Sequence, residues 1–297
     1  MELAAGAAQM PAKSYLYFPR YGGDLRIMPG YMEKSGIAGA KIVNVHPKNR
    51  GLPTVMALIV LNDPKTGLPL AVMDGTYITR MRTAAAAAIA TKYLSRPDSH
   101  SLGVVGAGGQ AKYQIAGVAA VRDLKEILVS DVNEKAVDRL RGEMKRAGIV
   151  IRKAGMRQAC SRDILTTITP VRKPIVKYEW IREGMHINAI GADAKGKEEL
   201  EPAILKRAKI FIDDWEQASH SGEINVPLSK GLIAKGDIHA TLGEVVSGKR
   251  AGREKGMRGG KGITVFDSTG LSIQDISIAG LVLKQAKKNG MGRRLEF

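Results

Sequence analysis

A glycine-rich turn stands directly after a short apolar segment, Leu102–Val105, and before a segment of helical character. The turn, Gly106–Ala111, reads GAGGQA and fits the dinucleotide-binding pattern G-x-G-x-x-G/A. In this pattern Gly106 makes the tight turn and Gly108 lets the backbone approach a pyrophosphate, while the small Ala111 lets the helix pack against the strand. The N-terminus of the helix then faces the anion.

An acidic residue follows at the distance that this pattern requires. The next apolar segment, Glu126–Ser130, is followed by Asp131, 20 residues beyond Ala111, where a carboxylate binds the ribose hydroxyls of a dinucleotide. The glycine turn alone is a weak signal, and an ordinary βα turn with a surface aspartate is the alternative. The complete order of strand, turn, helix, strand and acid favours a dinucleotide. A carboxylate at Asp131 repels a 2′-phosphate, so NAD is favoured, although Lys135 leaves NADP open.

Strands and helices alternate from Ser101 onward. The segments Gln110–Val121 and Glu134–Ala147 have helical character. The expected strands are apolar runs rather than alternating patterns, which is typical of a parallel sheet covered on both faces. We therefore predict an α/β fold with a doubly wound parallel sheet, a Rossmann domain. Its strands are expected at Leu102–Val105, Glu126–Ser130, Ile164–Ile168, His186–Ile190, Ile210–Ile212 and Ile263–Phe266.

The residues before Ser101 follow a different pattern, with short strands that predict an antiparallel meander. The segment 63–67, DPKTG, is a strong turn between two of them, because Pro presets φ and Gly accepts a positive φ. An Ala-rich helical segment at about 79–96 ends at Pro97. The strands are expected at Ser14–Phe18, Asp24–Met28, Ala40–Val45, Val55–Asn62 and Leu68–Met73.

Two domains are expected, because a single core rarely grows much beyond ~250–300 residues and the chain has 297. The NAD-binding Rossmann domain is predicted over 98–267. A smaller α+β domain for substrate binding and dimerisation is predicted over 1–97 and 268–297, since the last helix, about Ile273–Lys288, is expected to return to the first lobe.

The charge balance is unusual, with 46 Lys and Arg against 29 Asp and Glu, a net charge of +17. Such a balance occurs in nucleic-acid-binding proteins. Here the excess is spread along the chain apart from the basic stretch Gly248–Gly262, which we expect to be an exposed loop, and the C-terminal tail. Aromatic residues make up 5%, too few for base-stacking platforms. Nucleic-acid binding is therefore a minor alternative, and a lysine- and arginine-rich solvated surface is preferred.

The single cysteine, Cys160, excludes an internal disulfide and a Cys-rich zinc site. No pair of histidines has metal-ligand spacing, so no metal is predicted. His46 and His186 are expected to be structural rather than functional. The chain shows neither a signal peptide nor an apolar run of about 18 residues, and we expect a cytoplasmic protein.

Four longer segments carry a resemblance to a known family. They are GLPTVMALIVLNDPKTGLPLAVMDGTYITRMRTAAA, VVGAGGQA, HINAIGADAKGKEEL and VFDSTGLSIQD. The chain resembles the ornithine cyclodeaminase/mu-crystallin family from about Pro11 to Lys288, and looks closest to its archaeal-type alanine dehydrogenase branch. The loop GADAKGK lacks the Cys-Pro that cyclodeaminases tend to carry, which favours the dehydrogenase branch. The family usually begins with a further strand and helix, and a homodimer built through the first lobe is expected.

The resemblance implies an anion-binding set and an acid–base residue. Arg26, Lys41 and Arg82 would bind the substrate carboxylate, which suits guanidinium groups because they bind carboxylates with two hydrogen bonds. Asp193, after the apolar run HINAIGA, would handle protons, with Lys197 in the same motif. Lys41 counts with Asp193 among the catalytic residues. The plainer alternatives are surface cations and an aspartate that caps the following helix.

The remaining site residues are also implied by the resemblance. Thr269 would complete the substrate site beside the three cations. The residues expected at the cofactor are Thr54, Arg82, Gly106, Gly108, Gly109, Gln110, Asp131, Thr169, Asn188, Ile190, Lys197 and Ser268.

The predicted function is therefore that of an NAD-dependent amino-acid dehydrogenase, with L-alanine as the preferred substrate. An ornithine cyclodeaminase, which recycles its NAD, and a ketimine reductase remain alternatives within the family. A non-enzymatic binding protein of the mu-crystallin kind is a further alternative, which the intact Asp193 and the intact set Arg26, Lys41 and Arg82 disfavour.

Overall fold

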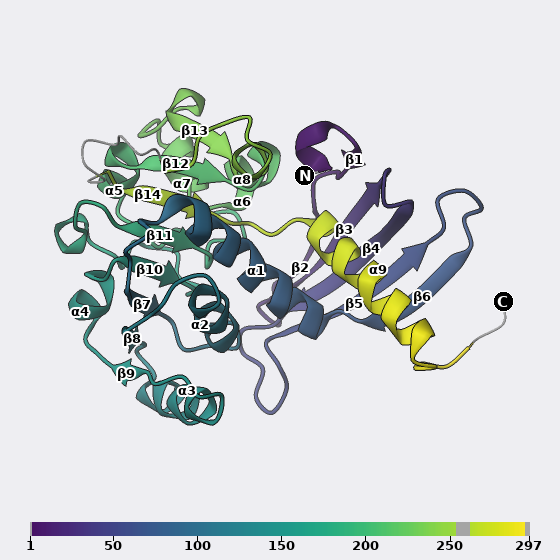
Figure 1. The fold of residues 1–297 in the computed structure, drawn as a ribbon, viewed down its shortest axis with the longest axis horizontal. Helices are drawn as coiled ribbons and strands as arrows, with labels where there is room; N and C mark the ends of the chain where they lie inside the picture. Colours follow the sequence, from purple (N-terminus) through teal and green to yellow (C-terminus); the bar gives the residue numbers. More distant parts are fainter. Residues whose placement is uncertain (1, 254–261, 295–297) are drawn as a thin grey trace. The chain divides into compact units, whose positions relative to one another are not determined.

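The protein forms two compact units in the computed structural model, which describes residues 2–253 and 262–294 (Figure 1). The first unit comprises Met1–Arg82 and Leu271–Phe297, and the second Thr83–Gly270. The chain passes from the first unit to the second inside the Ala-rich helix, whose later part, with Ala86, Ala90 and Leu94, packs in the second unit.

The first unit is an antiparallel sheet with a helix on one face. The strands follow the order β1-β3-β4-β5-β6, with β2 paired to β3, and α9 packs on β3, β4 and β5. Gly30 allows this close packing, since a Cβ there would lie 2.9 Å from Oγ of Ser272 on α9. The elements are η1 (Leu3–Ala5), β1 (Ala8–Gln9), β2 (Ser14–Phe18), β3 (Gly23–Met32), β4 (Ile37–Val45), β5 (Val55–Asn62), β6 (Pro69–Asp74) and α9 (Ser272–Lys288).

Side chains alternate between the two faces of this sheet. On β3, Arg26 and Met28 point to the face under α9, and Met28 pairs in register with Lys41 of β4. The same face continues into Ile59 of β5, which is fully buried. Two cations therefore lie on the buried face of the sheet, among apolar side chains.

The second unit is the predicted doubly wound α/β domain, and the expected fold class is confirmed. Its eight strands are parallel in the order β13-β12-β14-β11-β10-β7-β8-β9. The strands are β7 (Ser101–Val105), β8 (Glu126–Ser130), β9 (Arg152–Lys153), β10 (Ile164–Thr167), β11 (His186–Ala189), β12 (Lys209–Ile212), β13 (Ile238–Thr241) and β14 (Thr264–Asp267).

Helices cover both faces of this sheet (Figure 1). Leu165, Ile187 and Val265 pack under α4–α6, whereas Leu102 and Phe266 point to the opposite face, under the helices α1–α3 and α8. The helical elements are α1 (Thr76–Leu94), α2 (Ala111–Ala119), α3 (Glu134–Arg146), α4 (Met156–Cys160), η2 (Tyr178–Trp180), α5 (Pro202–Arg207), α6 (Trp215–Ser221), α7 (Asn225–Ser229), η3 (Lys235–Asp237) and α8 (Leu242–Val246).

The chain reverses direction across the sheet between β7 and β10. After β7 the chain adds β8 and β9 on one side, and then returns to place β10 on the other side of β7. Ligands of such sheets bind outside the carboxyl ends of the strands at this switch point. The glycine turn after β7 and the residues after β10 are therefore the first place to look for a site.

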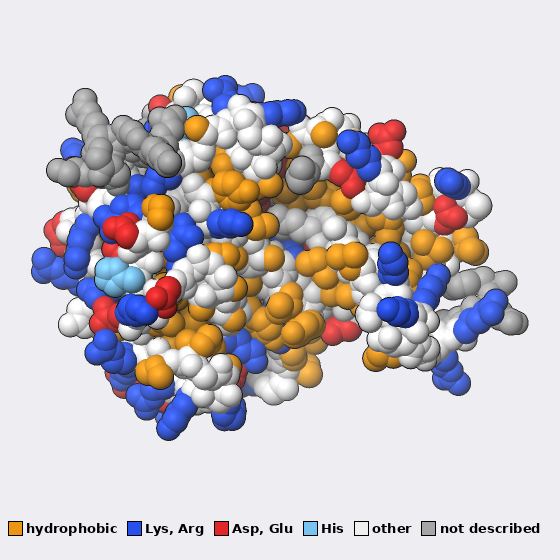
Figure 2. Space-filling view, viewed as in Figure 1, with side chains coloured by type: hydrophobic (Ala, Val, Ile, Leu, Met, Phe, Trp, Pro, Cys, Tyr) orange, Lys and Arg blue, Asp and Glu red, His pale blue; other side chains and the backbone are white. Residues whose placement is uncertain are grey.

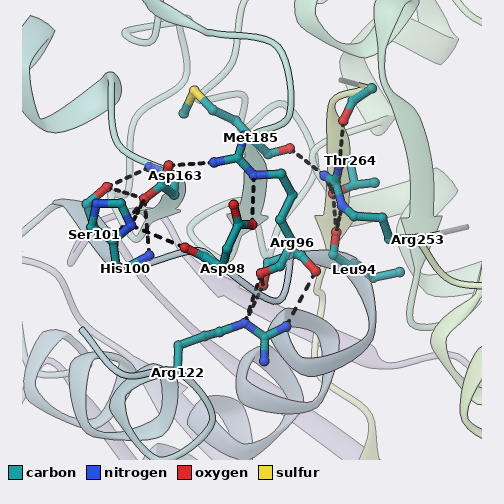
Figure 3. Close-up of polar contacts among 12 residues, drawn as sticks. Leu94, Arg96, Asp98, His100, Ser101, Arg122, Asp163, Met185, Arg253 and Thr264 are labelled. Atoms are coloured by element: carbon teal, nitrogen blue, oxygen red, sulfur yellow. Dashed lines mark hydrogen bonds and ion pairs between the residues drawn. The ribbon is translucent and has the colours of Figure 1, made fainter. Parts of the chain in front are cut away.

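Arginines hold the opposite, amino edge of the sheet together (Figure 3). Arg122 donates hydrogen bonds to the carbonyl oxygens of Thr91, Ser95 and Arg96 at the end of α1. Arg253 donates to the carbonyl oxygens of Leu94 and of two loop residues, Gly262 and Met185. Burial lowers the pKa of Arg253 to about 10. Because these guanidinium groups bind helix and loop carbonyls, we assign this cluster to stability.

The basic stretch 248–262 lies partly outside the described residues. Its described start is held on the second unit, where the N–H of Arg253 donates to the carbonyl oxygen of Tyr93 at 2.9 Å. On the face drawn in Figure 2, Lys and Arg side chains are interspersed with acidic, neutral and apolar ones. Within the described part of the chain, every helix is too short or too polar to cross a membrane.

His186 is structural, as predicted. Its ring is fully buried at the start of β11, with Nδ1 3.0 Å from Oγ1 of Thr264 and Nε2 3.1 Å from Oδ1 of Asn188. Burial and the nearby Arg253 lower its pKa to about 3, so the ring is neutral. His46 stacks on Phe18 with ring centroids 5.8 Å apart.

Candidate active site

The glycine turn lies at the switch point and has the conformation that the sequence pattern requires. Gly106 has a φ of 110°, which L side chains rarely adopt. A Cβ on Gly106 would lie 2.8 Å from the carbonyl oxygen of Ile168, in the segment after β10. The turn after β7 and the segment after β10 thus approach each other closely only because residue 106 is glycine.

The next part of the turn is open. A Cβ built on Gly108 or Gly109 meets no described atom within 4 Å, and both residues are exposed. Oε1 of Gln110 is buried without a hydrogen-bond partner among the described residues. The helix α2 begins at Ala111, so the positive end of its dipole is at this turn. Open backbone and a helix N-terminus fit a bound pyrophosphate, whereas Oε1 of Gln110 is an acceptor that a hydroxyl donor would satisfy.

Asp131 connects the end of β8 to this turn. Its Oδ2 accepts a hydrogen bond from the backbone N–H of Ala107 at 2.6 Å, and its Oδ1 accepts one from the N–H of Asn133 at 2.7 Å. The carboxylate therefore has a fixed orientation beside the glycine turn. This is the place where the sequence pattern predicts contacts to ribose hydroxyls.

A buried glutamate that the sequence pattern did not indicate, Glu199, joins the segments after β10 and β11. Its Oε1 accepts hydrogen bonds from the N–H and Oγ1 of Thr169, at 2.7 and 2.6 Å, and its Oε2 accepts from the N–H of Gly191 at 2.9 Å. Burial raises the pKa of Glu199 despite these hydrogen bonds. Thr169 and the buried Ile190, both predicted cofactor residues, thus lie in segments held by one carboxyl group.

Asp193 lies four residues beyond β11, at the carboxyl edge of the sheet. Its Oδ1 is 2.5 Å from Nζ of Lys197, and the side chains are 32% and 14% exposed. The aspartate is thus accessible while its charge is balanced by a lysine. A carboxylate in this state is suited to exchange protons with a small ligand or a water molecule.

Two further predicted residues follow β14. Oγ of Ser268 is buried without a hydrogen-bond partner among the described residues. The backbone N–H and Oγ1 of Thr269 donate to the carboxylate of Asp213, which follows β12, at 2.7 and 2.9 Å. The side chain of Asn188, in contrast, bonds within the core to Thr91 and His186, so it serves the core of the unit.

The predicted anion-binding residues lie in the first unit, where Lys41 and Arg82 share one carboxylate. Asp275 places Oδ2 2.7 Å from Nζ of Lys41 and Oδ1 2.9 Å from Nε of Arg82. The side chains of Lys41, Arg82 and Asp275 are 1%, 8% and 0% exposed. Burial and the neighbouring Arg82 lower the pKa of Lys41 to about 7, although Asp275 acts in the opposite direction. Asp275 stands in the segment VFDSTGLSIQD but was not among the predicted site residues.

Arg26 stands on the same buried sheet face as Lys41. Its Nε is 2.7 Å from Oδ1 of Asp24, and its guanidinium lies 5.3 Å from the ring centroid of Tyr15. Thr54 is exposed just before β5, where its carbonyl oxygen accepts a hydrogen bond from the N–H of His46. The first unit therefore brings the three predicted cations to its buried face and leaves Thr54 in a separate loop.

Some solved proteins that resemble this chain have NAD or NADH bound. The model of the ornithine cyclodeaminase/mu-crystallin family matches residues 1–290. The alanine dehydrogenase of Archaeoglobus fulgidus is 50% identical, with 99% of this chain and 89% of that protein covered. A solved archaeal alanine dehydrogenase dimer with bound NAD matches with a TM-score of 0.94 at 50% identity, covering 100% of this chain and 91% of that one. Thermococcus litoralis Δ1-pyrroline-2-carboxylate reductase, solved with NADH and L-proline, matches with a TM-score of 0.95 at 41% identity, covering 99% and 92%.

Proposed function

The chain belongs to the ornithine cyclodeaminase/mu-crystallin family, and from this membership we propose that it is an NAD-dependent amino-acid dehydrogenase whose substrate is L-alanine. The reaction converts L-alanine, NAD⁺ and water to pyruvate, ammonium, NADH and a proton. The observation that carries the proposal is the 50% identity to an alanine dehydrogenase across almost the whole chain. The glycine turn with Asp131 and the buried Lys41–Arg82 pair supply the cofactor and carboxylate sites that this reaction needs.

NAD, when bound, supplies the acceptor for the hydride that leaves Cα of the amino acid. The open turn at Gly108 and Gly109 binds its pyrophosphate, and Asp131 binds the adenosine ribose. The carboxylate of Asp131 repels a 2′-phosphate, so NAD is preferred to NADP. Gln110 supplies an unsatisfied amide oxygen beside this site.

The substrate carboxylate is bound by Lys41 and Arg82, with Arg26 on the same sheet face. Asp275 contacts Nζ of Lys41 and Nε of Arg82. The other N–H groups of the ammonium and of the guanidinium are therefore available to an anion. A guanidinium binds a carboxylate with two parallel hydrogen bonds, which fixes the orientation of the amino acid.

Asp193 handles the protons of the reaction. Loss of hydride from Cα leaves an iminium, and water must add to it before ammonia leaves. The Asp193 carboxylate takes the proton of this water, and Lys197, paired with it at 2.5 Å, orients the carboxylate. Asp193 then returns the proton to the amino nitrogen. The C–N bond breaks, ammonia leaves, and the hydroxyl loses its proton to become the carbonyl group of pyruvate.

The test is the production of NADH from NAD and L-alanine by the purified chain, followed by absorbance. Asp193→Asn should lower kcat by about 10²–10⁴-fold, because the base is lost. Asp237→Asn, at the exposed 3₁₀ turn η3, is a matched control and should retain activity. Absence both of NADH production from L-alanine and NAD and of NADH oxidation with pyruvate and ammonium would reject the proposal.

A second candidate is the reduction of a cyclic ketimine. The observation that favours it is the 41% identity and TM-score of 0.95 with the Thermococcus litoralis reductase. The same carboxylate-binding pair and cofactor turn serve both reactions, so the structure of these groups does not separate the substrates. NADH oxidation with Δ1-pyrroline-2-carboxylate, faster than with pyruvate and ammonium, would establish this second candidate. Proline formation from L-ornithine without net NADH would instead establish a cyclodeaminase.

We also propose that the protein is a homodimer that associates through the open face of the first sheet. The solved archaeal relative is a dimer. The face of the sheet opposite α9 exposes Leu16, Ile27, Leu58 and Val72, with exposed fractions of 40–62%. Burial of such side chains stabilises association. Leu58→Glu should yield a monomer in light scattering, whereas Val150→Glu, on the second unit, should leave the dimer intact.

The proposed compartment is the cytoplasm. The single cysteine, Cys160, is buried, and burial raises its pKa to about 12, so the thiol is inert. A chain of this size without an internal disulfide suits a reducing compartment. Fractionation of the source cells, with detection by antibody, tests this placement.

A further inference from the structure

The carboxylate of Asp275 stands between two buried cations of different elements. Lys41 belongs to β4, Arg82 to α1 and Asp275 to the first turn of α9. One carboxylate oxygen pairs with Nζ of Lys41 at 2.7 Å and the other with Nε of Arg82 at 2.9 Å. Because each oxygen holds one cation, the orientation of the carboxyl group fixes the spacing between the two cations.

Without the carboxylate of Asp275, the charged form of Lys41 would be disfavoured. Burying a charge disfavours its ionised form, and a like charge nearby adds to the effect. Both act on Lys41, whose pKa is lowered to about 7 by burial first and by Arg82 second. Asp275 opposes them through its charge and its hydrogen bond. Removal of Asp275 would therefore favour loss of the proton from Lys41.

The other groups around Lys41 give no substitute for Asp275. Its register partners on the flanking strands β3 and β5 are Met28 and Ile59, which carry no charge. Lys13, in the segment before β2, lowers the pKa of Lys41 further. On the same sheet face Arg26 adds a third cation, paired with Asp24. Among the described residues, the acid that bonds to Lys41 is Asp275.

The pair retains donors for a ligand. The ammonium of Lys41 has three N–H groups and the guanidinium of Arg82 has five. Asp275 is the acceptor that the described residues provide to these two side chains. The remaining donors of two almost fully buried cations are left to an incoming anion.

We propose that Asp275 is a positioning residue for substrate binding, which sets the spacing of Lys41 and Arg82 and keeps Lys41 charged, so that the pair binds the carboxylate of the substrate. This inference rests on the proposed function only in that the ligand is a carboxylate. Asp275 itself acts through the two cations and not on the reacting atoms.

The experiment is a calorimetric titration of the full-length protein with oxalate, a small unreactive carboxylate, across a range of pH. In the wild type, affinity should fall as pH rises through about 7, where Lys41 loses its proton. In Asp275→Asn this fall should begin about one pH unit lower or more. At the acid end, where Lys41 is protonated in both proteins, the variant should still bind oxalate more weakly than the wild type, because the carboxylate no longer holds the two cations at one spacing.

Asp63→Asn is the matched control, since it removes one negative charge from an exposed turn of the same unit and should leave the curve in place. The proposal is overturned if folded Asp275→Asn loses affinity for oxalate at the same pH as the wild type. It is also overturned if the affinity is lowered by the same factor at every pH. Circular dichroism and thermal melting establish whether the variant is folded.

Asp275→Glu keeps the test decisive if the asparagine variant does not fold. The longer carboxylate retains the charge but moves it, so the fall should stay near the wild-type pH while affinity drops about tenfold, or ~1.4 kcal/mol. Affinity equal to that of the wild type would refute the positioning role. Oxalate binding does not depend on turnover. A wild type that binds oxalate as expected but does not oxidise L-alanine rejects the proposed function alone.

Discussion

The carboxylate of Asp131 accepts a hydrogen bond from the backbone N–H of Ala107 at 2.6 Å, which ties the end of β8 to the glycine turn after β7. Its second oxygen accepts from the N–H of Asn133 at the start of α3. An acid that the sequence pattern assigns to ribose binding therefore also shapes the turn that faces the pyrophosphate. The two hydrogen bonds hold the negative charge of Asp131 where a 2′-phosphate of NADP would have to lie.

Asp131→Ala should weaken NADH binding by about 10–100-fold, since hydrogen bonds to a charged group contribute ~1.5–3 kcal/mol. NADPH binding should change much less, because its 2′-phosphate no longer meets a carboxylate. Fluorescence titration with both cofactors gives the two dissociation constants. Asp123→Ala, which removes an exposed carboxylate of the same unit, is the control. An unchanged ratio of NADH to NADPH affinity would show that Asp131 does not select the cofactor.

Gly106 and Gly108 should respond differently to the same substitution. Gly106→Ala places a methyl group 2.8 Å from the carbonyl oxygen of Ile168 at a φ of 110°, so it should destabilise the fold by about 1–3 kcal/mol. Gly108→Ala places its methyl group in open space and should leave stability unchanged, while it weakens NADH binding because the backbone can no longer approach the pyrophosphate closely. Thermal melts and NADH titrations measure the two effects. A Gly108→Ala variant that binds NADH normally would place the pyrophosphate elsewhere.

The sequence was sufficient to predict the order of the elements that form the cofactor site. Leu102–Val105 is an apolar run of strand length, and the glycines after it permit only a tight turn, so local chemistry determined β7 and the start of α2. The strand and helix bounds differ from the prediction by a few residues. For example, α1 begins at Thr76, whose N–H donates to the side chain of Asp74.

Other parts of the structure depend on contacts between distant residues. Asp275 pairs with Arg82 across 193 positions of sequence, and Asp213 bonds to Thr269 across 56. Nothing in the residues next to Asp275 distinguishes it from a surface acid on a helix. Its role follows from the packing of α9 on the sheet. The short elements β13 and α6–α8 were also not predicted, because they carry neither the apolar runs that marked the other short strands nor enough residues to show a helical period.

The buried neutral ring of His186 should make the protein sensitive to acid. Its pKa is about 3 when folded and returns to about 6.5 when unfolded, so the unfolded state binds more protons between these values. The contribution of His186 to stability is complete above about pH 6.5 and is lost as pH falls, by ~1.4 kcal/mol per pH unit.

His186→Gln should therefore show a shallower dependence of the free energy of unfolding on pH between about pH 6 and 4. Urea unfolding at several pH values measures this slope. His220→Gln removes an exposed histidine of the same unit and should keep the wild-type slope. Parallel slopes for wild type and His186→Gln would mean that the ring is not buried in its neutral form.

Arg122 should contribute to stability without affecting the cofactor site. It donates to carbonyl oxygens at the end of α1, at the amino edge of the parallel sheet (Figure 3). The glycine turn follows β7 and therefore lies at the carboxyl edge. Arg122→Met leaves those carbonyl groups without their donor, at a cost of about 2–4 kcal/mol.

The urea midpoint of Arg122→Met should fall, while the folded variant binds NADH with wild-type affinity. Arg139→Met, on the exposed side of α3, removes the same charge and should preserve both properties. If Arg122→Met lost NADH affinity in proportion to stability, the two edges of the sheet would be coupled. If instead its midpoint matched the wild type, the hydrogen bonds of Arg122 would be replaced by water, and the cluster at the amino edge would have no role in stability.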